Sequence, residues 1–177
     1  PENRLLWKFN RQRLNLEAMR DTLLKVTGRL NARMGGKPVE ITKTEWKPRR
    51  SVYGYIERQN LPNFFRTFDF ASPDSSSPGR FRTSVPQQAL YLMNSPFMKK
   101  LVGDMPLSLT LEATGPAVQE KAMHKVYQAF FQRNPTRSEL EMGMDFFGSN
   151  EASGKPETMW EQYVQILLMS NELIFID

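Results

Sequence analysis

The sequence predicts an all-α or mostly α fold of about five helices, joined by a long irregular segment and with room for a short strand pair. Apolar residues recur at three- and four-residue steps in the N-terminal part and in the second half, which is the period of amphipathic helices. Capping residues and prolines precede several of these stretches. The stretch from Gly35 to Ser84 lacks a sustained helical period. Because 177 residues suit one domain, we expect residues 1–177 to form a single domain.

The first predicted helix lies in the N-terminal part. One apolar stripe runs along it at helical spacing, formed by Leu16, Met19, Leu23, Val26 and Leu30. We expect the helix to weaken near Gly28 and to stop by residues 35–38, where two glycines and a proline prevent continuation.

The remaining predicted helices follow residue 84, and each begins at a local start signal. A serine or threonine three residues before a glutamine or glutamate is a capping box, and proline suits the first helical turn. These signals predict a helix from the Ser84–Gln87 pair to Asn94, a second from Ser95-Pro96, a third from Gly115-Pro116, a fourth from the Thr136–Glu139 pair to about Phe147, and a fifth from near Pro156.

The stretch between these two parts predicts little regular structure. Residues Val39–Trp46 alternate in polarity and allow a short strand or an extended arm. Residues Ser51–Arg58 allow helical turns or a strand, since aromatic and β-branched residues favour strands. Residues 63–66 predict a brief helical turn, and Ser72–Gly79 predict a loop.

Composition excludes several classes of site. The chain has no cysteine, which excludes disulfides, thiolate metal sites, a cysteine nucleophile and c-type haem attachment within it. No apolar run approaches the roughly 18 residues needed to cross a bilayer, so no membrane span is expected. The first residue is Pro1 rather than methionine, and we interpret the chain as a fragment of a larger protein.

Residues 46–83, hereafter the central segment, differ chemically from the rest of the chain. They hold seven basic and three acidic residues, and eight of the 20 aromatic residues. The residues that could bind a ligand or partner are Arg49, Arg50, Tyr53, Arg58, Asp69, Arg80 and Arg82.

Three interpretations of the central segment remain open. Its rings, among them Tyr53, Phe64, Phe65 and Phe68, could be core residues with arginines lying over them. The segment could instead dock onto a partner domain, because arginine and aromatic residues are enriched at interfaces. It could also bind a polysaccharide or polyanion, or single-stranded nucleic acid with bases stacked on rings.

Asp69 and Asp74 are the candidates for acid–base catalysis, since both lie in the irregular segment. The alternative is that Asp69 pairs with a nearby arginine and holds a loop in shape, because charges removed from water need partners. No metal site is predicted.

Motifs along nearly the whole chain resemble one known family. The motifs are Pro1-Glu2-Asn3-Arg4-Leu5-Leu6-Trp7, Glu17-Ala18-Met19-Arg20-Asp21, Arg49-Arg50-Ser51-Val52-Tyr53, Phe68-Asp69, Arg80-Phe81-Arg82-Thr83, Pro86-Gln87-Gln88-Ala89-Leu90, Asn94-Ser95-Pro96-Phe97, Arg133-Asn134-Pro135-Thr136 and Ser170-Asn171-Glu172-Leu173-Ile174-Phe175. Together they resemble the C-terminal domain of unknown function (domain-of-unknown-function family 1553) of planctomycete-type bacterial proteins that also carry a cytochrome-c-like domain.

The resemblance implies that this chain is the later portion of that domain, in a large exported protein. An extracytoplasmic location follows from it, with upstream domains of the same polypeptide as partners. The family supplies no catalytic residues to carry over. No cofactor is expected in this chain, because it lacks a C-x-x-C-H motif, and any haem would belong to another part of the parent protein.

These observations together predict a non-catalytic interaction module of an exported multidomain protein. The alternative is a polysaccharide- or polyanion-binding domain, with Asp69 and Asp74 available for hydrolysis. Nucleic acid is disfavoured as a partner, because the net charge is only +5 and the resemblance implies export.

Overall fold

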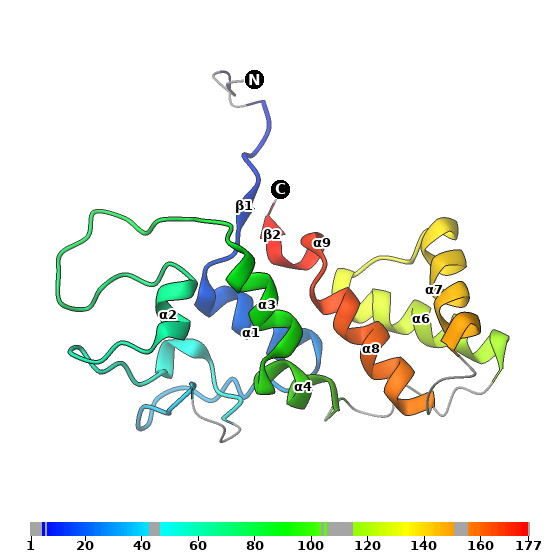
Figure 1. The fold of residues 1–177 in the computed structure, drawn as a ribbon, viewed down its shortest axis with the longest axis horizontal. Coiled ribbons are helices and arrows are strands. Elements are labelled where there is room, and N and C mark those ends of the chain that lie inside the picture. Colours follow the sequence, from blue (N-terminus) through cyan, green and yellow to red (C-terminus); the bar gives the residue numbers. More distant parts are fainter. Residues whose placement is uncertain are drawn as a thin grey trace.

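The computed structural model describes residues 5, 7–42, 47–103, 105, 115–150 and 156–176 (Figure 1). This part of the chain contains eight α-helices, a short 3-10 helix and one two-stranded antiparallel pair. The prediction of a mostly α fold is therefore confirmed. The predicted number of about five helices is too low. The apolar stripe and the start signals described above account for six helices, and the other two are only one turn long and depend on tertiary packing.

The N-terminal half is built around α1 (Leu16–Val26). The Asn15 side chain caps this helix by accepting a hydrogen bond from the Ala18 amide at 2.9 Å. The helix ends before Gly28, whose positive φ turns the backbone away, so Leu30 lies beyond it. The other elements of this half are β1 (Gln12–Arg13), the 3-10 helix η1 (Ser51–Tyr53), α2 (Asn63–Thr67), α3 (Pro86–Asn94) and α4 (Pro96–Gly103).

The second half consists of α6 (Pro116–Phe131), α7 (Arg137–Asn150), α8 (Pro156–Leu168) and α9 (Asn171–Ile174), followed by β2 (Phe175–Ile176). The capping box predicted for α7 is confirmed. The Thr136 amide donates to the Glu139 carboxylate at 2.7 Å, and the Glu139 amide donates to the Thr136 hydroxyl at 3.3 Å. Helix α7 runs past its predicted end at Phe147, because glycine weakens a helix without forbidding it.

The two halves share one hydrophobic core. Helix α8 packs against both α4 and α7, and α9 packs against α6, so the C-terminal helices bridge the two groups (Figure 1). Phe65 and Phe68 of the central segment are buried in this core, and Phe64 packs against it. The interpretation as core residues is therefore confirmed for these three rings, whereas Tyr53 is only partly buried and does not belong to the core.

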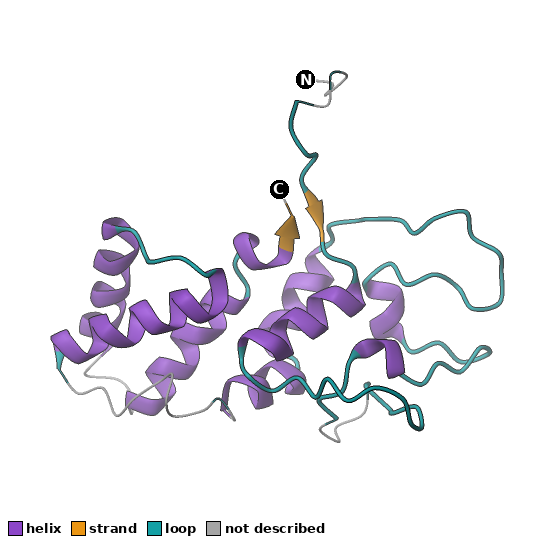
Figure 2. Ribbon diagram, turned by 180° about the vertical axis from the view of Figure 1, so that it is seen from behind, coloured by secondary structure: helices purple, strands orange, loops and turns teal. Residues whose placement is uncertain are grey.

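The strand pair lies outside the central segment and joins the two ends of the chain. Gln12 pairs with Ile176 and Arg13 with Phe175, and Figure 2 shows the two strands side by side. Of the two alternatives for Val39–Trp46, a short strand or an extended arm, the strand is not formed over the described residues. Val39 makes only an isolated parallel bridge to Gly54, and residues 43–46 lie outside the described part of the chain.

One predicted capping interaction is wrong. Helix α3 begins at Pro86 after Val85, and no side chain caps it, so Ser84 and Gln87 do not form the predicted capping box. The neighbouring Gln88 is buried and donates from its amide to the carbonyl of Thr67 at 2.8 Å. Gln88 therefore pairs with the end of α2, and the start of α3 has no side-chain cap.

Two segments project from the helices. One is the N-terminal arm (Leu5 and residues 7–11) beyond β1, and the other is the loop between α2 and α3 (Figures 1 and 2). Within the described residues, no helix combines the length and the apolar character that crossing a membrane requires.

Candidate functional site

Polar residues of α1 hold the first part of the central segment in place. Arg20 is 4 % exposed although it carries a charge. Its guanidinium donates to the carbonyls of Lys47 and Arg49, each at 2.8 Å, and to the Ser51 hydroxyl at 3.2 Å. Burial lowers the pKa of Arg20, and Asp21 partly offsets this effect. An arginine remains charged under these conditions, so its hydrogen bonds are charge-assisted.

Asp21 binds the same stretch of the chain, and we call Arg20 and Asp21 together the α1 anchor. Its carboxylate accepts the Ser51 amide at 2.7 Å and the Ser51 hydroxyl at 2.8 Å. The Arg50 guanidinium approaches the same carboxylate at 3.8 Å, while its side chain remains 51 % exposed. Because these hydrogen bonds join several backbone groups of residues 47–51 to two side chains of α1, they fix the path of this stretch.

Arg49 and Tyr53 fold the preceding loop. The Arg49 guanidinium carbon lies 4.1 Å from the centroid of the Tyr53 ring, and the guanidinium donates to the carbonyls of Arg33, Gly35 and Lys37. The Tyr53 hydroxyl accepts the Gly35 amide at 2.8 Å. Both predicted binding residues are therefore engaged within the fold.

Arg58 and Arg80 also contact the chain itself. Arg58 is exposed and donates to the carbonyl of Pro73 at 3.3 Å. Arg80 donates to both carboxylate oxygens of Glu17 on α1, at 2.8 and 2.7 Å. Its guanidinium carbon also lies 4.6 Å from the centroid of the Phe70 ring.

Asp69, at the C-terminal end of α2, forms a clamp with Arg13 and Thr83. Asp69 Oδ2 accepts Arg13 Nη2 at 2.8 Å and the Thr83 amide at 2.8 Å, and Oδ1 accepts the Thr83 hydroxyl at 2.7 Å. Arg13 Nε also donates to the Thr83 carbonyl at 3.2 Å. Asp69 pairs with an arginine, as the alternative interpretation predicted, but with distant Arg13 of β1 rather than with a nearby one.

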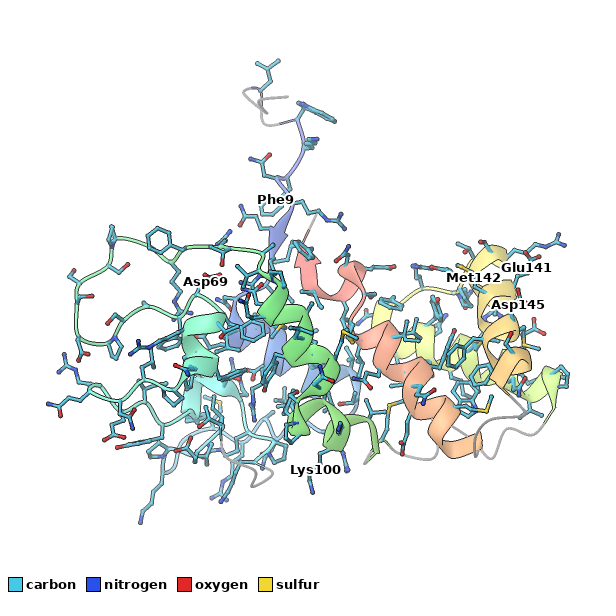
Figure 3. All side chains as sticks on the ribbon, viewed as in Figure 1. Phe9, Asp69, Lys100, Glu141, Met142 and Asp145 are labelled. Carbon is cyan, nitrogen blue, oxygen red and sulfur yellow. The ribbon has the colours of Figure 1, made fainter. Side chains whose placement is uncertain are left out.

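The clamp borders a recess, hereafter the clamp recess, with a volume of about 210 Å³. It lies between the start of α1, the end of α2 and the returning end of the α2–α3 loop, and Figure 3 marks Asp69 at this position. Its lining consists of Arg13, Leu14, Asn15, Phe68, Asp69, Arg80, Phe81 and Arg82.

The predicted site residues separate into two clusters and a remainder. Asp69, Arg80 and Arg82 meet at the clamp recess. Arg49, Arg50 and Tyr53 gather around η1 and α1 instead. Arg58 and Asp74 are exposed, and neither lines the clamp recess.

Sequence reasoning missed the residues that organise both clusters, namely Arg13, Glu17, Arg20 and Asp21. For Arg20 a signal was present. It lies four residues after Leu16 and three before Leu23, so it belongs to the buried stripe of α1, where a charge must find partners. Arg13 carried no such signal, because its partner Asp69 is 56 residues away.

The geometry offers little for the predicted catalysis. Both oxygens of Asp69 already accept hydrogen bonds from Arg13 and Thr83, so the carboxylate would have to break the clamp to act on a substrate. Among the described residues, no group of three histidine, aspartate or glutamate side chains could hold a metal ion.

A family model agrees with the motifs of the sequence. The model described as PSD1, protein of unknown function (DUF1553), matches residues 1–147, which include α1, the central segment and the whole lining of the clamp recess. No curated protein and no solved structure matches the chain. The match extends over most of the sequence, and the chain therefore belongs to the DUF1553 family.

Proposed function

We propose that the chain is a non-catalytic interaction module that docks, through its N-terminal arm, onto another part of the same polypeptide. The observation that carries this proposal is the exposure of three large apolar side chains within five residues. Leu5, Trp7 and Phe9 are 89 %, 75 % and 57 % exposed. They lie on a segment that projects from the fold, where Figure 3 marks Phe9. Apolar groups concentrated in this way are typical of interaction surfaces.

The arm suits docking better than the first part of the central segment does. Arg20 and Asp21 already bind the backbone of residues 47–51, and Arg49 lies over Tyr53. The Arg49 guanidinium and the Tyr53 hydroxyl, both proposed for docking there, are thus already engaged within the fold. The arm continues directly from β1, which pairs with β2 and ties the arm to the folded body.

The partner we propose is an upstream domain of the parent polypeptide that presents an apolar groove. The resemblance to cytochrome-c-associated proteins supports this choice, as well as an extracytoplasmic location. In this proposal any haem is held elsewhere in the parent polypeptide. Burial of Trp7 and Phe9 would contribute about 1.5–3 kcal/mol for each side chain.

The test measures association between this chain and the separately produced remainder of its parent polypeptide, by isothermal titration calorimetry. Replacing Trp7 and Phe9 together by serine is expected to weaken binding by at least about tenfold, because each loses its buried area. The matched control replaces Met142 and Ile166 by serine, since both are also exposed and lie on α7 and α8. Equal affinity of the arm variant and the wild type, or no association at all, would overturn the proposal.

The hydrolytic alternative receives no support from this geometry. Asp69 is engaged by the clamp, and Asp74 lies outside the clamp recess. We therefore propose no reaction for this chain.

A further inference from the structure

We propose that the clamp recess binds an oxyanion group, a carboxylate or a sulfate, between Arg13 and Arg82, and that Phe81 covers the body of the ligand. This inference is independent of docking through the arm, because none of the arm residues lines the clamp recess.

Arg13 has one guanidinium nitrogen without a hydrogen-bond partner among the described residues. Its side chain is only 8 % exposed, and its Nη2 and Nε atoms are engaged by Asp69 and Thr83. Its Nη1 atom is buried and has no hydrogen-bond partner within the described chain. A buried guanidinium N–H without an acceptor is costly. Nη1 has almost no solvent-accessible surface, and the guanidinium carbon lies 5.6 Å from the centroid of the Phe68 ring. An anion in the clamp recess would therefore supply the missing acceptor once the Arg13 guanidinium rotates towards the recess.

Positive charge is in excess around the clamp recess. The lining holds three guanidinium groups, of Arg13, Arg80 and Arg82, and one carboxylate, of Asp69. Counting Glu17 as well, which pairs with Arg80, still leaves one positive charge in excess. Leu14 and Asn15 of the lining also immediately precede α1, whose N-terminal dipole favours an anion.

Arg82 carries the uncompensated positive charge at the clamp recess. Arg82 is exposed and makes no hydrogen bond or ion pair with any described residue. The neighbouring Thr83 is fixed by the clamp at its amide, hydroxyl and carbonyl, so the backbone beside Arg82 is held in place. The fixed backbone holds Arg82 at the clamp recess, where its guanidinium is available to an anion.

The clamp recess limits the size and the shape of the ligand. The volume of about 210 Å³ is below that of typical drug-sized sites, so it suits one acidic group rather than a large molecule. Phe81 lines the same recess and is 82 % exposed, which leaves its ring available to cover an apolar or ring-shaped body attached to that group.

The test is a titration of the whole chain followed by two-dimensional ¹H–¹⁵N NMR, with the Nε–Hε signal of Arg13 as a direct reporter. The probes are glucuronate, acetate and inorganic sulfate, with glucose as the neutral counterpart of glucuronate, all at constant ionic strength. We expect saturable shifts of Arg13 and of the Phe81–Thr83 amides with the anions, at a Kd of about 1 mM, and no shift with glucose. Tighter binding of sulfate or of the carboxylates would identify which oxyanion the site prefers.

Two variants separate this site from general charge effects. Arg82→Gln is expected to weaken anion binding about tenfold, because it removes one charge-assisted hydrogen bond. The matched control is Arg66→Gln, which removes the same charge from another exposed arginine on the adjacent helix α2, outside the lining. It is expected to change the affinity by less than about twofold, because exposed charges are screened by salt.

Phe81→Ala tests the role of the ring. It is expected to weaken the binding of glucuronate while leaving that of acetate unchanged, because only glucuronate has a body to cover.

No saturable shift with any anion, equal shifts with glucose, or an equal loss in Arg66→Gln would overturn the anion site. Equal effects of Phe81→Ala on both ligands would overturn the role of Phe81. Loss of docking in the arm variant with retained anion binding would distinguish the two proposals.

Discussion

Asp69 binds Thr83 twice, through the backbone amide at 2.8 Å and the side-chain hydroxyl at 2.7 Å, and thereby closes the loop that joins α2 to α3. Asp69 itself has a positive φ of 58°. Aspartate adopts this left-handed conformation more readily than most residues, because its side chain can hydrogen-bond locally. The backbone conformation of Asp69 and its contacts with Arg13 and Thr83 therefore both help to close the loop between α2 and α3.

We predict that Asp69→Asn destabilises the chain by about 2 kcal/mol, because the Arg13 guanidinium loses its charged partner and the asparagine NH2 group cannot accept the hydrogen bond from the Thr83 hydroxyl. Asparagine tolerates positive φ, so the loss reports the clamp rather than backbone strain. The measurement is urea unfolding followed by circular dichroism. Asp74→Asn, on the exposed part of the same loop, is the control and is expected to change stability by less than about 0.5 kcal/mol. Equal stability of the two variants would show that the clamp contributes nothing.

The α1 anchor gives a second prediction. Arg20→Met keeps most of the side-chain volume but leaves the acceptors at Lys47, Arg49 and Ser51 without their donor. We expect a loss of about 3 kcal/mol in unfolding free energy, together with faster proteolysis within residues 47–55. Lys25→Met, on the exposed side of the same helix, is the control. Unchanged proteolysis in Arg20→Met would contradict the anchoring role.

Two glycines of α7 give a matched pair of substitutions. At Gly143 an added Cβ would collide with the Met123 sulfur of α6 and would approach the Tyr163 hydroxyl of α8 at 3.1 Å. At Gly148 an added Cβ would meet nothing within 4 Å. Thermal unfolding should therefore show Gly143→Ala to be less stable by about 1–3 kcal/mol, since the collision outweighs the better helix propensity of alanine.

Gly148→Ala should be more stable than the wild type by about 0.5 kcal/mol, because only the helix propensity changes. If both alanine variants raised the melting temperature, the close approach of α6, α7 and α8 at Gly143 would be wrong.

The start of α7 gives a prediction for pH. Hydrogen bonding to the Arg133 guanidinium, at 2.7 Å, is the main cause that lowers the pKa of Glu139 from 4.5 to about 2, and the Thr136 amide and hydroxyl add to it. A carboxyl group whose pKa is lowered on folding stabilises the folded state above its unfolded pKa. This contribution should therefore be complete above about pH 5 and should disappear as the pH falls towards 2.

Glu139→Gln tests this directly. Because the pair is partly exposed to solvent, we expect the variant to be less stable than the wild type by about 1 kcal/mol at neutral pH. The difference should shrink as the pH is lowered through the same range, as measured by urea unfolding. A difference that stayed constant with pH would exclude ionisation of Glu139 as its source.

Local signals in the sequence predicted local structure well. The Thr136–Glu139 capping box, the prolines that begin α4, α6 and α8, and the end of α3 at Asn94 are all found as predicted. Each of these depends on atoms only a few residues apart, so the sequence contains the information needed to place them. The Ser84–Gln87 prediction failed, because α3 begins after Val85 and no side chain caps it.

The candidate site was predicted only in part, because its paired side chains lie far apart in the sequence. Asp69, Arg80 and Arg82 are 13 residues or fewer apart in a segment that composition singled out, but Arg13 and Glu17, their partners, come from another part of the chain. Side-chain pairs with long sequence separation leave no periodicity or spacing to read.

The sequence by itself determined the helical character of this protein, the starts of its longer helices and its membership of the DUF1553 family, because these follow from local periodicity, caps and motifs. Only the tertiary structure decided which arginines of the central segment are engaged. Most of them neutralise acids, bind carbonyls or lie over rings within the fold, since charges next to a core must be paired. Arg82 and one nitrogen of Arg13 are left beside a common recess, because the Asp69 clamp places together two segments that the sequence keeps far apart.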